Sequence, residues 1–96
     1  MPMVTATPDQ YAAEMLAIAH ILDREGAFYG PAAQRHGNAT AAALRESAVT
    51  PPDCEEAFRY RLCLLLDWHP RRNKRDLDAA VARANAYTAA LNKGHE

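Results

Sequence analysis

Apolar residues recur at helical spacing along most of the chain, and capping residues mark where each helix begins. The first such segment covers residues 8–25, because Thr7-Pro8-Asp9-Gln10 combines a capping box with proline at the first helical position. Gly26 is suited to end this helix. The apolar stripe consists of Tyr11, Met15, Ile18 and Leu22. The stripe predicts an amphipathic helix that buries one face.

The segment after the loop 26–30 contains conflicting signals. Pro31 favours a helix start, and the residues that follow are helix formers up to about Ala48. Gly37-Asn38 is a turn signal in the middle of this segment. We therefore expect a short helix, a turn and a second short helix from about Ala39. A single kinked helix is the alternative.

Two further helices are expected in the second half of the chain. Residues 52–67 form the first, and its apolar arc widens until it covers most of the last turn, which predicts the central helix of the fold. Glu55 and Arg59 have the spacing of an ion pair on its outer side. Asn73 is placed to cap the last helix, which Gly94 closes. The apolar stripe of that helix consists of Leu77, Val81, Ala84, Thr88 and Leu91.

These segments predict an all-α protein, a compact bundle of four to five helices with short connections. Alanine is the most frequent residue and β-branched residues are few, which favours helices over a sheet. We expect one helical domain over residues 8–94. Residues 1–7 are expected to form a disordered or extended tail.

Composition and motifs exclude several classes of function. The formal net charge is −1, so the whole chain has no electrostatic preference for nucleic acid or membranes. We find no membrane-spanning segment and no secretory signal, and expect a soluble cytoplasmic protein. Catalytic and metal-binding spacings are missing, so we expect no enzyme activity, no cofactor, no metal and no small-molecule substrate. Cys54 is expected in the core and Cys63 near the surface or in a groove.

The segment 69–75 carries the strongest local charge. Its four cations, and no acid, stand just before a helix N-terminus, where backbone N–H groups favour anions. The cations are Arg71, Arg72, Lys74 and Arg75. The segment therefore predicts an anion contact, either with a nucleic-acid backbone or with an acidic patch on a protein. The alternative is a solvated loop paired with nearby acids such as Asp76 and Asp78.

Three other features are candidates for contact with a partner. Phe28 and Tyr29 lie between two glycines, and either plug the end of the bundle or act as binding anchors. Arg61 falls inside an apolar stripe, so it either extends its guanidinium group to water, or pairs with a carboxylate such as Glu14 or Glu25, or faces a partner chain. Ala82 and Ala86 belong to a small-residue face of the last helix that allows close helix approach, including self-association as a homodimer.

The segment 31–46 resembles a helix-turn-helix, because Ala33 followed by Gly37 matches the spacing between helix and turn in that motif. Asn38 departs from the motif, which usually has an apolar residue there. The resemblance implies a DNA-binding regulator that uses residues 31–47. Its candidate DNA contacts are Arg35, Thr40 and Arg45.

The function expected from these features is a non-enzymatic protein-interaction module: a small helical adaptor, subunit or inhibitor, of the kind found in phages and mobile elements. It would bind a protein partner through helix faces and the basic segment. The DNA-binding regulator is the alternative.

Overall fold

A computed structural model describes residues 6–94 of the chain. In order, the elements are α1 (Pro8–Gly26), the 3-10 helix η1 (Ala27–Tyr29), α2 (Pro31–Ala48), α3 (Glu55–Leu66) and α4 (Lys74–Gly94). No strand occurs in this range, so the expected all-α class is confirmed, with four α-helices. Residues 1–5 of the expected N-terminal tail lie outside the described part of the chain.

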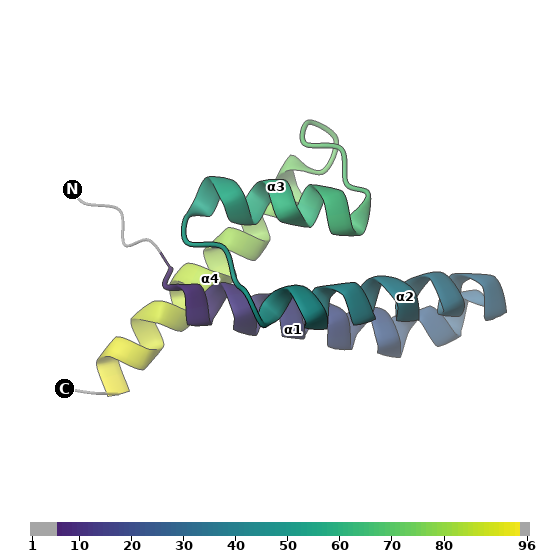
Figure 1. Ribbon diagram of the computed structural model, residues 1–96, viewed down its shortest axis with the longest axis horizontal. Helices are drawn as coiled ribbons and strands as arrows, with labels where there is room; N and C mark the ends of the chain where they lie inside the picture. Colours follow the sequence, from purple (N-terminus) through teal and green to yellow (C-terminus); the bar gives the residue numbers. More distant parts are fainter. Residues whose placement is uncertain (1–5, 95–96) are drawn as a thin grey trace.

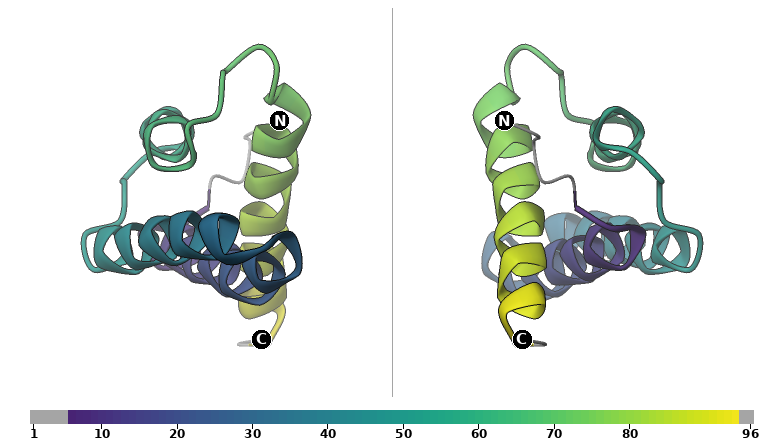
Figure 2. Two further views of the ribbon diagram at one scale, coloured as in Figure 1. Left: turned by 90° about the vertical axis from the view of Figure 1, so that its right-hand side faces the viewer. Right: turned by 90° about the vertical axis from the view of Figure 1, so that its left-hand side faces the viewer.

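The helices α1 and α2 form an antiparallel hairpin that runs along the longest axis of the molecule (Figure 1). Chain direction reverses again after α2, and α3 lies over one part of the hairpin (Figure 1). Figure 2 shows the axes of α1, α2 and α3 roughly aligned, with neighbouring helices in the chain antiparallel, while α4 crosses them. The molecule measures 46 × 29 × 22 Å.

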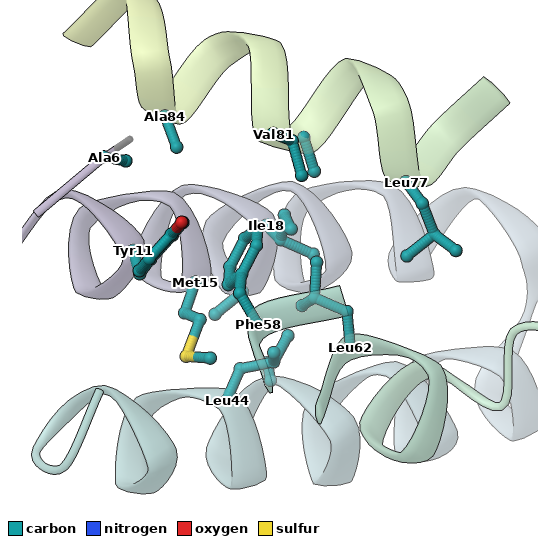
Figure 3. Close-up of a cluster of buried hydrophobic side chains, with 13 residues drawn as sticks. Ala6, Tyr11, Met15, Ile18, Leu44, Phe58, Leu62, Leu77, Val81 and Ala84 are labelled. Carbon is teal, nitrogen blue, oxygen red and sulfur yellow. The ribbon is translucent and has the colours of Figure 1, made fainter. Parts of the chain in front are cut away.

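The core lies where α4 crosses the hairpin beneath α3, and all four helices contribute side chains to it (Figure 3). Tyr11 of α1 stacks on Phe58 of α3, with ring centroids 4.5 Å apart and an interplanar angle of 21°. The buried residues of α1 lie against both α2 and α4. The expectation that α3 is the central helix is therefore wrong, because α1 holds that position and α3 covers it from one side.

The predicted stripe of α4 is confirmed over most of its length. Leu77, Val81, Ala84 and Thr88 are buried, whereas Leu91 is 41% exposed. The stripe loses its cover near the C-terminus because the end of α4 projects beyond the hairpin (Figure 2). On α1, Tyr11, Met15 and Ile18 are buried as predicted.

The helix α2 continues through Gly37-Asn38 without the predicted turn. Gly37 is buried, and a Cβ atom at this position would lie 3.3 Å from the backbone oxygen of Leu22. The glycine therefore permits close approach of α1 and α2 rather than a chain reversal. The two-helix prediction for this segment is wrong. The alternative of a single kinked helix is confirmed in that one helix spans the segment, whereas its kink stays a prediction.

Of the N-terminal tail expected over residues 1–7, the structure describes Ala6 and Thr7. Ala6 is buried in the core, at 5% exposure. Thr7 is extended and its backbone N–H donates to Oε1 of Gln10 at 2.6 Å, as a capping box requires. Oε1 of Gln10 also accepts a hydrogen bond from Thr88, so this cap is joined to α4.

Candidate functional site

The helix α3 has two apolar faces, and only one of them is covered. Phe58 and Leu62 on the inner face are fully buried. Tyr60 and Leu64, one turn apart on the outer face, are 67% and 65% exposed. Large apolar side chains at this spacing on an exposed helix face are typical of a contact surface.

The outer face of α3 borders a groove of about 540 Å³ that reaches the start of α4. We call it the α3–α4 groove. It is lined by Arg59, Tyr60, Cys63, Leu64, Trp68, Pro70, Lys74 and Leu77. Most of this lining is apolar, with an indole, a phenol ring and a proline, and its two cations lie on α3 and at the start of α4. Such a groove suits apolar anchor residues of a partner.

The two cations that line the groove share one carboxylate. Nη2 of Arg59 lies 2.8 Å from Oδ1 of Asp78, and Nζ of Lys74 lies 2.7 Å from Oδ2. The hydrogen bonds from Lys74 and then Arg59 hold the pKa of Asp78 below its usual value. Arg59 thus pairs with Asp78 of α4 and not with Glu55 as expected. This ion pair joins α3 to α4 beside the groove.

The basic segment 69–75 forms a tight turn over residues 69–73 and then enters α4 at Lys74, beside the groove. The backbone N–H of His69 donates to Oδ1 of Asn73 at 2.9 Å, and Nδ1 of His69 accepts from the backbone N–H of Arg71 at 3.2 Å. Asn73 directly precedes α4, as predicted for a cap, and its backbone oxygen accepts from the backbone N–H of Leu77 at 3.0 Å. Its side chain stabilises the turn through Oδ1 and donates from Nδ2 to Oδ2 of Asp76 in the first turn of α4 at 3.4 Å. Within residues 6–94, Arg71, Arg72 and Arg75 have no carboxylate within ion-pair distance. Among the predicted anion contacts, only Lys74 is paired.

The two cysteines lie in different surroundings. Cys63 is partly buried and lines the groove, as predicted, but Cys54 is exposed at the start of α3 and not in the core. Cys54 is outside the core because α3 begins at Glu55, three residues later than expected. Across the described residues, no three His, Cys, Asp or Glu side chains are grouped to hold a metal ion.

Phe28 and Tyr29 lie in η1 at the tip of the hairpin, beyond the part that α3 covers (Figure 1). They are 82% and 77% exposed, so they do not plug the end of the fold. Their role as binding anchors stays a prediction. Their site is separate from the α3–α4 groove, because neither residue lines it.

Arg61 is partly buried and joins the end of α2 to α3. Its Nη1 donates to Oγ of Ser47 at 3.1 Å and to the backbone oxygen of Thr50. The expected carboxylate partner is wrong, because these neutral oxygens accept its hydrogen bonds. Glu14, one of the acids expected for it, pairs with Arg83 instead.

The predicted small-residue face of α4 is exposed, including Ala82 and Ala86. Tyr87 and Leu91 on the same helix are also exposed, at 52% and 41%. This surface lies outside the groove, since none of these four residues lines it.

The candidate DNA contacts do not form one reading surface. On a single helix, residues five positions apart point about 140° away from one another, so Arg35, Thr40 and Arg45 face different directions. Arg45 is paired with Asp23 of α1, and Thr40 is partly buried. Because α2 is one continuous helix over Pro31–Ala48, this segment does not form a helix-turn-helix.

Sequence reasoning missed Tyr60, Leu64 and Trp68 as site residues. The available signal is the apolar arc of α3, which is wider than a helix with one buried face needs. A central helix and a helix with an inner and an outer apolar face both have such an arc. No protein-family model, no curated protein and no solved structure matches the chain. Within the described range, every helix is too short or too polar to cross a membrane.

Proposed function

We propose that this protein is a non-enzymatic interaction module that binds an acidic, amphipathic segment of a partner protein in the α3–α4 groove. The observation that carries the proposal is the second apolar face of α3. Exposing Tyr60 and Leu64 to water gives no stability to the monomer, whereas covering them on binding removes apolar area from water.

The charges beside the groove support an acidic partner. Arg71, Arg72 and Arg75 are exposed and lack carboxylate partners in the described chain. Carboxylates that flank the apolar anchors of a partner would pair with these guanidinium groups. A second copy that presents the exposed end of α4 is a poorer occupant, because that surface offers alanine, Tyr87 and Leu91 but no acid.

The test is affinity capture from host lysate with four baits, each run with and without nuclease. The wild-type chain is compared with Leu64→Glu in the groove and with Arg71→Ala/Arg72→Ala in the basic segment. Ala42→Glu, on the exposed side of α2, is the matched control for adding a carboxylate. All four should unfold at similar temperatures, because the changed side chains are exposed.

The proposal expects a nuclease-resistant protein that the wild type and Ala42→Glu capture and that both groove-side variants lose. The captured protein should contain a segment with carboxylates around apolar anchors, and that segment as a synthetic peptide should protect Cys63, but not Cys54, from alkylation. Capture that survives Leu64→Glu would refute the groove as the site. Material that disappears on nuclease treatment would favour the DNA-binding regulator.

A further bait, Ala82→Glu/Ala86→Glu, tests the small-residue face of α4 in the same experiment. We propose this face as a secondary contact, either for the partner or for a second copy. Loss of capture by the Ala82→Glu/Ala86→Glu variant would show that α4 contacts the partner. A mass in solution half that of the wild type would show that α4 contacts a second copy. Unchanged capture and mass would leave the groove as the docking surface.

A further inference from the structure

Trp68 also lines a second cleft, of about 460 Å³, where the hairpin, the start of α4 and the connection after α3 meet. Its volume falls within the range of about 300–1,000 Å³ that is usual for small-molecule sites, and sites between helices are common. The lining consists of Ile18, Ile21, Leu22, Glu25, His36, Gly37, Thr40, Leu66, Trp68, Asp76, Ala79 and Arg83. Except for Trp68, these residues are distinct from those of the α3–α4 groove.

The lining of this cleft is apolar over much of its area and ionisable at a few positions. Isoleucine and leucine side chains from α1 and the end of α3, with Trp68 from the connection after α3, provide apolar surface for a ring or a short aliphatic chain. The ionisable residues that line it are Glu25, His36, Asp76 and Arg83. A small set of polar groups in a mostly apolar cavity is the usual arrangement of a site that selects one class of ligand.

The charges of the cleft do not cancel. Arg83 is already paired, since both its Nη2 and its Nε bind Oε1 of Glu14, at 2.5 and 2.7 Å. Glu25 and Asp76 have no cationic partner within ion-pair distance in residues 6–94, although Asp76 accepts a hydrogen bond from Asn73 at 3.4 Å. Glu25 and Asp76 therefore place two carboxylates in the lining that no ion pair within residues 6–94 balances. These carboxylates attract a cation that enters the cleft.

We propose that this cleft binds a small organic cation, an amine or ammonium compound with an aromatic or aliphatic body. The body would lie against the leucine and isoleucine side chains, and the cation would pair with Glu25 and Asp76. The indole of Trp68 adds an aromatic surface that also attracts cations. This site does not depend on the proposed protein partner, and nothing in the sequence pattern indicated it.

The test uses 2-phenylethylamine, with 2-phenylethanol and phenylacetate as neutral and anionic compounds of similar size. Each is titrated into the full chain at pH 7, and binding is followed by the NMR shifts of the Trp68 indole N–H and the Ala79 amide. The amine should bind about tenfold more tightly than the alcohol, as two ion pairs of ordinary surface strength predict. Phenylacetate should bind more weakly than both.

Three variants locate the ligand. Glu25→Gln/Asp76→Asn should remove the preference for the amine, and Ala79→Leu, which fills the cleft, should weaken the amine and the alcohol alike. Both changes are at exposed positions, so the fold should persist. Tyr60→Ala in the α3–α4 groove should leave binding unchanged. Equal binding of amine and alcohol, no saturable shift with the amine, or loss of binding only in Tyr60→Ala would each overturn the proposal.

Discussion

Arg83 of α4 and Glu14 of α1 form an ion pair between the two crossing helices, with Nη2 of Arg83 2.5 Å from Oε1 of Glu14. The side chain of Glu14 is only 7% exposed, whereas that of Arg83 is 54% exposed. Burial raises the pKa of Glu14, and the hydrogen bond and charge of Arg83 oppose that rise. The pair therefore limits the cost of an acid placed beside the core.

Arg83→Ala should make the free energy of unfolding fall more steeply with rising pH. Without the guanidinium, the pKa of Glu14 in the folded state should rise further above its ordinary value of 4.5. A carboxyl with a raised folded-state pKa binds its proton more tightly when folded. Stability is then greatest below pH 4.5 and falls as the pH rises through the folded-state pKa.

Urea unfolding at a series of pH values measures this dependence. Glu14→Gln is the control, because it has no proton to lose and should remove this contribution in both backgrounds. An Arg83→Ala profile parallel to that of the wild type would show that the pair does not set the pKa of Glu14.

Leu62 and Leu64 provide a matched test of the two faces of α3. Leu62→Ala removes a fully buried side chain and should lower the free energy of unfolding by about 2–5 kcal/mol. Leu64→Ala, two residues away, should change it by less than about 0.5 kcal/mol, because Leu64 is 65% exposed. Denaturant unfolding of both variants is the measurement. Equal losses would mean that the outer face of α3 is packed in solution.

Tyr11→Phe should keep or increase stability. Oη of Tyr11 is buried and has no hydrogen-bond partner among residues 6–94, so its removal leaves no group unpaired. The ring stacked on Phe58 remains. Phe58→Ala, which removes the other ring, should cost about 3–5 kcal/mol in the same unfolding assay. A loss above 1 kcal/mol in Tyr11→Phe would show that the hydroxyl is paired in solution.

Gly30→Ala should destabilise the protein by about 1–3 kcal/mol. Gly30 precedes α2 with φ 101° and ψ 171°, a conformation that residues with a Cβ atom rarely adopt. No atom lies within 4 Å of the added Cβ, so the cost would be conformational and not steric. Gly94→Ala, which is equally open and has no such φ, is the control. Thermal unfolding compares the two, and equal melting temperatures would contradict the assignment of strain at Gly30.

Local signals in the sequence determined where most helices begin and which faces are apolar. Thr7-Pro8-Asp9-Gln10 predicted the start of α1, and the stripe from Leu77 to Thr88 predicted the buried face of α4. These features depend on residues within one or two turns of each other. Helix propensity, caps and periodicity act at that range, so they can be evaluated without the rest of the chain.

Only the tertiary structure decided what each apolar face meets. The wide apolar arc of α3 is compatible with a central helix or with one that has an inner and an outer face, and periodicity cannot distinguish the two. Gly37 is likewise compatible with a turn or with close helix packing, until the backbone of Leu22 is found beside it. The groove and the cleft that share Trp68 depend on how α4 crosses the hairpin. That crossing is set by packing between residues far apart in the chain, which no local pattern encodes.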